Sequence, residues 1–203
     1  MMMLRQTVLG FSALVVAASL QAAPAVGQSA PDFALRDASG KAVKLSDFRG
    51  KHVVLEWTNP GCPYVRKHYD SGNMPAIQRE AVDKGVVWLA INSTGKSSSE
   101  YMEPASLVAW QNARKAQPTA TLLDEEGTAG KAYGARTTPH MYIVDPQGRL
   151  IYAGGIDSIP SSDPADIGKA VNYVRQGLNE ALAGKPVSAA VTRPYGCSVK
   201  YAS

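Results

Sequence analysis

Nearly continuous apolar runs of strand length alternate with segments of helical composition along the first half of the chain. The segments 63–84 and 104–115 predict helices, the first of them interrupted at Ser71-Gly72-Asn73, where poor helix formers adjoin. Strands covered on both faces of a sheet are predicted between and around them. These runs cover 52–57, 85–91 and 119–124. The β-α-β-α order predicts an α/β sheet that begins with parallel strands.

Turn residues between short alternating stretches predict two β-hairpins. The first joins 31–35 to 41–45 across Asp37-Ala38-Ser39-Gly40. The second joins 138–145 to 149–154 through Pro146-Gln147-Gly148, after a short helix at 127–133. The sheet is therefore expected to end in antiparallel strands.

The strongest helical period lies near the C-terminal end, where we predict one helix from Asp163 to Ala183. Its apolar residues recur at spacings of three and four, and Gly184 follows as a stop signal. The recurring residues are Ile167, Val171, Val174, Leu178 and Leu182.

The first residues have the composition of a secretory leader. Arg5 supplies a positive charge, 8–18 form an apolar core, and Ala22-Ala23-Pro24-Ala25 offers small residues for cleavage. Cleavage predicts a secreted or periplasmic protein that is not stably inserted in the membrane and works where disulfides persist. An uncleaved signal anchor is the competing interpretation. We divide the chain into a signal peptide at 1–25, a single domain at 26–186 and a C-terminal tail at 187–203.

The charge pattern argues against a nucleic-acid partner. The formal net charge is +4, and Lys and Arg are interleaved with Asp and Glu. No basic stripe of the kind that binds a phosphate backbone is formed, so nucleic-acid binding is not expected.

Cys62 lies at a predicted strand-to-helix turn, in Trp57-Thr58-Asn59-Pro60-Gly61-Cys62-Pro63. The free amides and the positive dipole end of a helix N-terminus favour the thiolate, which is the form that attacks disulfides and peroxides. The second of the two cysteines, Cys197, is close to the C-terminus. Redox chemistry at Cys62 is indicated, with Cys197 as its partner, a structural bridge or a bystander.

Four motifs in order along the chain carry a family resemblance. They are Ala30-Pro31-Asp32-Phe33, the stretch 45–51, Cys62-Pro63 after a strand and Thr138-Pro139 before one. With them, the chain from Pro31 to about Ala183 resembles the thioredoxin-like redoxins, specifically the alkyl hydroperoxide reductase and thiol-specific antioxidant (AhpC/TSA) branch and the extracytoplasmic thioredoxins of cytochrome c maturation. The resemblance implies a thioredoxin-like α/β fold, with a central mixed sheet flanked by helices and an N-terminal hairpin extension.

The same resemblance implies a substrate groove beside Cys62. It places Pro139 in the cis form, which a prolyl bond adopts at modest cost, and it assigns Thr138, Pro139, His140 and Pro63 to substrate binding. Two alternatives stay open: Pro139 starts an edge strand, and His140 is a hydrogen-bonded strand histidine.

Glu56 precedes Cys62 by six residues, the offset at which thioredoxin carries a buried acid. The resemblance therefore implies that Glu56 handles protons during exchange. A carboxylate desolvated beneath the sheet would have a raised pKa and could act as a general base. The alternative is a strand-edge carboxylate that reaches solvent.

Two positions depart from the motifs of the family. Val65 stands where thioredoxins have the second cysteine of Cys-x-x-Cys, so no local resolving thiol exists. Asn59 stands where peroxiredoxins have Thr or Ser, with Thr58 one position further away. A planar amide replaces a rotatable hydroxyl there, so we expect poor peroxide reduction.

These departures give Cys197 more weight, because it follows the last helix as the resolving cysteine of some peroxiredoxins does. It could attack a mixed disulfide or a sulfenate at Cys62. A permanent structural disulfide and pairing between subunits are the alternatives.

Charged residues after Cys62 have two interpretations. Arg66, Lys67 and His68 could stabilise its thiolate, but we expect them to be solvated residues of a helix exterior. No metal site is expected, since thioredoxin-like copper chaperones need a close cysteine pair, which Val65 removes.

Together these features predict an extracytoplasmic thiol-disulfide oxidoreductase. Cys62 attacks, Glu56 handles protons, and Cys197 resolves. No organic cofactor is implied, because electrons travel through the cysteines. The partners are a protein disulfide or hydroperoxide substrate and an unknown thiol reductant. The alternative functions are a peroxiredoxin-like thiol peroxidase and a redox-inactive thioredoxin-like binding protein.

Overall fold

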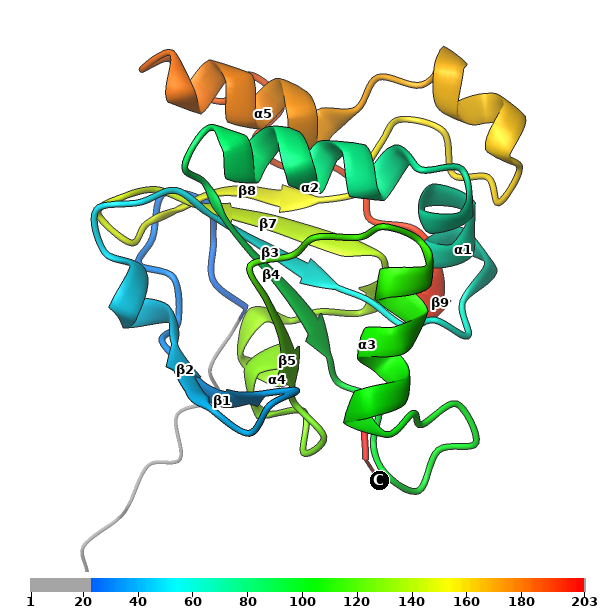
Figure 1. Cartoon of the computed structure of the whole chain (residues 1–203). Coiled ribbons are helices and arrows are strands. Elements are labelled where there is room, and N and C mark those ends of the chain that lie inside the picture. Colours follow the sequence, from blue (N-terminus) through cyan, green and yellow to red (C-terminus); the bar gives the residue numbers. More distant parts are fainter. Residues whose placement is uncertain (1–22, 203) are drawn as a thin grey trace, which may run out of the picture.

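A seven-stranded mixed sheet forms the centre of the computed structural model, which describes residues 23–202 (Figure 1). The strand order is β2-β1-β5-β4-β3-β7-β8. The strands are β1 (Ala34–Asp37), β2 (Ala42–Lys44), β3 (Val53–Trp57), β4 (Val87–Asn92), β5 (Ala120–Leu123), β7 (His140–Val144) and β8 (Leu150–Gly154).

Five α-helices and two 3₁₀ turns surround this sheet in the described part of the chain. The helices are α1 (Pro63–Asp70), α2 (Asn73–Asp83), α3 (Pro104–Ala113), α4 (Thr128–Tyr133) and α5 (Tyr173–Leu182), and the 3₁₀ turns are η1 (Leu45–Phe48) and η2 (Pro164–Lys169). The predicted interruption of the first helix is confirmed, since Gly72 separates α1 from α2 with a left-handed φ of 77°.

The strand directions confirm the predicted α/β class. β3, β4 and β5 run parallel, β7 pairs antiparallel with β3, and β8 pairs antiparallel with β7. β3 lies between β4 and β7, and this central position explains why all five of its residues are buried.

Two apolar clusters cover the two faces of the sheet. Leu55 and Trp57 belong to the cluster that contains Tyr133 of α4. Val54 belongs to the opposite cluster, which also contains residues of α1, α2 and α5. Because successive strand residues point to opposite faces, Glu56 shares a face with Val54. Figure 1 shows α2 and α5 lying over this face.

The prediction of one continuous helix from Asp163 to Ala183 is wrong. The segment is divided into η2 and α5, and α5 starts after Asn172, whose side chain accepts a hydrogen bond from the Arg175 amide at 2.9 Å. Before it, the Val171 amide bonds to the Ser158 hydroxyl at 2.9 Å. These contacts draw the backbone away from a helical path and leave Val171 51% exposed, although its spacing suggested a buried position.

The C-terminal tail folds back across the domain, passes the start of α1 at Cys197 and ends near Gly95 and α4. Its strand β9 (Cys197–Ser198) pairs antiparallel with β6 (Thr137–Thr138) in a separate two-stranded sheet. The periodicity of the tail gave no indication of this strand. Its pairing joins positions far apart in sequence and creates the site described below.

The burial of the parallel strands predicts how a core substitution changes the free energy of unfolding. Leu89 is completely buried in β4, and we expect Leu89→Ala to lower the free energy of unfolding by about 2–5 kcal/mol through lost burial and a residual cavity. Urea unfolding measures this loss. The matched control is Val191→Ala, at a side chain 71% exposed, with an expected change within about 0.5 kcal/mol. Equal losses in both variants would contradict this assignment of the core.

Candidate functional site

The two cysteines meet although 135 positions separate them. Their Sγ atoms lie 2.7 Å apart, and both are free thiols in this structure. Cys62 is only 1% exposed, whereas Cys197 is partly exposed. The two sulfurs are thus placed for the reversible formation of a disulfide.

The loop around Pro139 brings Cys197 to this position. The Thr138–Pro139 bond is cis, which confirms the prediction and excludes a simple edge-strand role for Pro139. Thr138 pairs with Cys197 in the β6–β9 register, and its carbonyl oxygen lies 3.1 Å from Sγ of Cys62. The tail therefore occupies the edge of β6 beside Pro139, where a substrate is predicted to bind.

The surroundings of the two sulfurs differ. Cys62 is the N-cap residue of α1, followed by Pro63 at the first helical position, so its sulfur lies at the positive end of a helix. Burial raises the pKa of Cys197 to about 12, and the adjacent Cys62 adds to this increase. Burial therefore favours the protonated form of Cys197.

Glu56 is completely buried, so the alternative of a solvent-exposed strand edge is wrong. Three side chains donate hydrogen bonds to its carboxylate: the Tyr69 hydroxyl at 2.7 Å, the Trp88 indole at 2.8 Å and the Gln78 amide at 3.1 Å. Burial raises the pKa of Glu56 above its ordinary value of 4.5, and these hydrogen bonds oppose the shift. The sequence carried no signal for the three donors.

Asn59 is committed to the turn that carries Cys62. Its side-chain oxygen accepts from the Gly61 amide at 2.7 Å, and its side-chain nitrogen donates to Glu100 at 2.7 Å. The backbone amide of Cys62 donates to the Asn59 carbonyl at 3.0 Å. Both ends of the Asn59 side chain are therefore occupied by protein groups.

The two remaining predicted groove residues differ in exposure. Pro63 is exposed, whereas His140 is 5% exposed, in β7. Nδ1 of His140 lies 3.3 Å from the Arg136 amide, which donates to it, and 3.2 Å from the Tyr142 hydroxyl. Burial lowers the pKa of His140 to about 3, and Arg136 adds to this effect. This is the environment of a hydrogen-bonded strand histidine; substrate binding by Pro63 and His140 stays a prediction.

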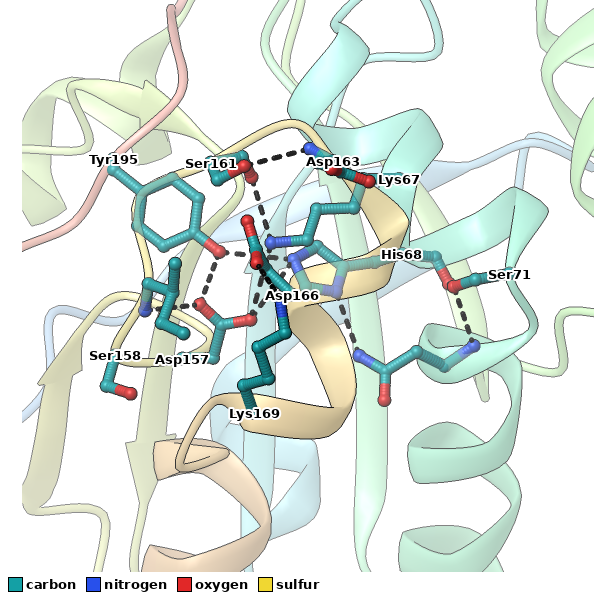
Figure 2. Close-up of polar contacts among 12 residues, drawn as sticks. Lys67, His68, Ser71, Asp157, Ser158, Ser161, Asp163, Asp166, Lys169 and Tyr195 are labelled. Atoms are coloured by element: carbon teal, nitrogen blue, oxygen red, sulfur yellow. Dashed lines mark hydrogen bonds and ion pairs between the residues drawn. The ribbon is translucent and has the colours of Figure 1, made fainter.

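Lys67 and His68 are buried, so the expectation that they are solvated is wrong. α1 turns them toward Asp157 and Tyr195, as Figure 2 shows. The pKa of His68 is lowered to about 3, first by burial and then by Lys67. Arg66 is exposed and donates to the Pro60 carbonyl at 2.8 Å. Over residues 23–202, no cluster of three or more His, Cys, Asp or Glu side chains is placed to hold a metal ion.

The family model described as the AhpC/TSA family matches residues 26–153. The chain belongs to the AhpC/TSA family. The matched region contains Cys62, Glu56 and the cis-proline loop, whereas Cys197 and the tail lie beyond it.

Two curated relatives and one solved structure are similar to this chain. A thiol-disulfide oxidoreductase ResA of Bacillus subtilis is 24% identical over 132 residues, which are 62% of this chain and 64% of the relative. The chain thus spans less than two thirds of that relative's length. A peroxiredoxin Bcp of the same species is 29% identical over 132 residues, covering 62% of this chain and 82% of the relative.

The solved structure is the thioredoxin domain of a thiol-disulfide oxidoreductase from Bacteroides vulgatus. It is 22% identical, has a TM-score of 0.52, and the match covers 71% of this chain and 96% of that one. The fold of this AhpC/TSA chain is therefore thioredoxin-like, as predicted. Its relatives are named as thiol-dependent oxidoreductases of two kinds, one acting on disulfides and one a peroxiredoxin.

The buried acid of this AhpC/TSA domain predicts a pH dependence of stability. A raised pKa means that the folded state binds the Glu56 proton more tightly than the unfolded chain. Its contribution is complete below about pH 4.5 and is lost as the pH rises through the folded-state pKa. The wild-type free energy of unfolding should therefore fall relative to Glu56→Gln as the pH rises above 4.5, by up to about 1.4 kcal/mol per pH unit.

Urea titrations at a series of pH values measure this difference, with Glu126→Gln at an exposed carboxylate as the matched control. A wild-type-minus-variant difference that stays level or rises between pH 4.5 and 8 would contradict the raised pKa.

Proposed function

We propose that this protein is an extracytoplasmic thiol-disulfide oxidoreductase in which Cys62 is the nucleophile and Cys197 the resolving thiol. The observation that carries the proposal is the 2.7 Å separation of the two sulfurs beside a cis proline. A binding protein without redox chemistry does not require two thiols brought together across the fold, and this favours turnover over a redox-inactive function.

The exchange proceeds in two balanced steps. The Cys62 thiolate attacks one sulfur of a substrate disulfide, forms a mixed disulfide and releases the first substrate thiolate. Cys197 then loses its proton and attacks the Cys62 sulfur, which closes the Cys62–Cys197 disulfide and releases the second substrate thiolate. The substrate gains two electrons, and an external thiol returns the protein to its dithiol form.

Glu56 is our proposed proton acceptor for the resolving step. Its pKa is raised by burial, so a proton can be held there at a pH at which an exposed carboxylate would be fully ionised. Cys197, with a pKa of about 12, requires removal of its proton before attack. Both shifts favour the protonated form, so Glu56 can accept the proton of Cys197 only when its own carboxylate is ionised.

A substrate reaches Cys62 only when the tail gives way. The β6–β9 pairing covers two residues on each strand, so little backbone pairing has to be released. Beside it lies a cavity of about 510 Å³ whose lining includes Thr137, Arg193 and Gly196. We propose that an extended polypeptide substrate enters here and pairs with the Thr138 edge in place of Cys197.

The extracytoplasmic location rests on the leader composition. Residues 1–22 of the predicted signal peptide lie outside the described residues. From 23 to 202, no helix is long and apolar enough to cross a membrane. We keep the predicted domain boundaries as part of this proposal, with Cys197 in the tail at 187–203.

Peroxide reduction is the second candidate, favoured by the similarity to the peroxiredoxin Bcp. Asn59 is unsuited to orient a peroxide, because protein groups occupy both ends of its amide. The buried Thr58 hydroxyl has no hydrogen-bond partner among residues 23–202, and we propose it as the peroxide donor for this second function. We favour disulfide exchange, which needs only an accessible thiolate in line with the target bond.

Cysteine variants separate the two proposed thiol roles. Cys62→Ser should reduce turnover of a model protein disulfide, such as insulin, to the uncatalysed rate, because a hydroxyl forms no thiolate at neutral pH. Cys197→Ser should instead accumulate a covalent mixed disulfide at Cys62, detected by mass spectrometry. Circular dichroism serves as the folding control. Turnover that survives Cys62→Ser would place the reaction elsewhere, and an adduct equally abundant in the wild type would remove Cys197 from the resolving role.

Stopped-flow mixing of the reduced protein with hydrogen peroxide separates the two substrates. We expect Cys62 to be oxidised at about the rate of a free thiol at the same pH, because no committed donor polarises the peroxide. Oxidation much faster than this, and slowed by Thr58→Val, would overturn our preference and establish a peroxiredoxin-like peroxidase.

A further inference from the structure

A buried polar cluster lies next to the cysteine pair and joins the tail to the domain. We call it the tail anchor, and it consists of Lys67, His68, Asp157 and Tyr195 (Figure 2). The side chains of Lys67 and His68 are 0% exposed and that of Asp157 is 2% exposed. The exchange steps do not use these residues, although Asp157 and Tyr195 also line the cavity through which we propose that a substrate enters.

The hydrogen bonds of the tail anchor form a chain in which each group donates to the next, and the last acceptor is Asp157. The Asn73 amide nitrogen can only donate, so Nδ1 of His68, 2.8 Å away, accepts. With its pKa near 3, His68 is neutral and carries its proton on Nε2, which faces the Tyr195 hydroxyl oxygen at 3.2 Å. Tyr195 donates its one proton to Oδ1 of Asp157 at 2.6 Å.

Further groups of the domain contact the Asp157 carboxylate and compensate its negative charge. The Ile159 amide donates to Oδ1 at 3.1 Å, and Nζ of Lys67 lies 3.8 Å from Oδ2. Lys67 also donates to the Ser161 carbonyl at 2.9 Å. Since the domain supplies all of these groups, Asp157 is a fixed acceptor. Tyr195 is the one member of the tail anchor that comes from the tail.

The link from Tyr195 to Cys197 is short and constrained. Only Gly196 separates them, and its φ of 133° is one that other residues rarely adopt. A Cβ at Gly196 would collide with the carbonyl of Thr138, the residue that pairs with Cys197. The position of the Tyr195 ring is therefore transmitted to Cys197 with little freedom between them.

We propose that Tyr195 is a positioning residue for Cys197. Held by Asp157 and His68, it fixes the tail so that the second sulfur stays against Cys62. This inference rests on the proposed exchange function. A tethered thiol acts at an effective concentration set by its freedom of movement, so Tyr195 would govern how readily the Cys62–Cys197 disulfide is reduced by an external thiol.

The tail has separate attachments beyond Cys197, so loss of one hydroxyl should leave it bound. The Val199 amide donates to the Arg136 carbonyl at 3.1 Å, and the Lys200 carbonyl accepts from the Gly95 amide at 2.8 Å. The Tyr201 hydroxyl donates to the Ala135 carbonyl at 2.7 Å. The effect of Tyr195 is thus expected to be local to the cysteine pair.

The test measures the equilibrium of the Cys62–Cys197 disulfide in glutathione redox buffers. Tyr195→Phe removes the hydroxyl and retains the ring. We expect the effective concentration of Cys197 at Cys62 to fall about tenfold, which raises the reduction potential by about 30 mV. Tyr64→Phe is the matched control, because the Tyr64 ring packs edge-on against the Tyr195 ring, with 5.8 Å between the ring centroids. The reduction potential of the Cys62–Cys197 disulfide in this variant should equal that of the wild type.

Asp157→Asn weakens the same hydrogen bond from the domain side and serves as a second variant if Tyr195→Phe does not fold. An equilibrium constant with glutathione within twofold of the wild-type constant in the folded variants would overturn the positioning role and leave the exchange function intact. A wild type that forms no Cys62–Cys197 disulfide in any buffer would instead refute the proposed function, and this inference with it.

Discussion

The pairing of Thr138 with Cys197 is the contact on which the rest of the site depends. It places a thiol from the end of the chain against the buried thiol at the start of α1. The same pairing covers Cys62 and fills the strand edge beside the cis proline. Reactivity and protection of Cys62 therefore have one structural origin.

The tail supplies the second thiol next to Cys62, because α1 has no second cysteine. In Cys-x-x-Cys proteins both thiols sit on one turn, so their separation is set by local helical geometry. Here Val65 is buried in the core at the position of the second thiol, and the partner sulfur arrives from 135 positions away. The position of this sulfur is therefore set by tertiary contacts. Buried polar groups that bind the tail, such as Asp157 and His68 with Tyr195, contribute to it.

The domain contains two buried polar networks, one around Glu56 and one around Asp157, and each has a different physical character. Around Glu56, burial raises the pKa of the carboxylate, while hydrogen bonds from three donors oppose that shift. Around Asp157, a lysine and several donors compensate a carboxylate that holds a tyrosine in place. The first network is suited to chemistry, whereas the second is suited to fixing geometry.

The sequence by itself determined most of the sheet and the Cys62 turn, because apolar runs and turn residues are local signals. The cis form of Pro139 followed only from the family resemblance that the Thr138-Pro139 motif carries. The sequence also pointed to Glu56 and Cys197, through their position and their scarcity. It failed for the final helix, where Asn172 and the Ser158 contact override the apolar period of Val171. Tertiary structure alone decided that Lys67 and His68 are buried, that Tyr195 bonds to Asp157 and that the two sulfurs meet. These outcomes depend on the path of the tail, which carries no periodic signal because its contacts are made with the folded domain and not within itself.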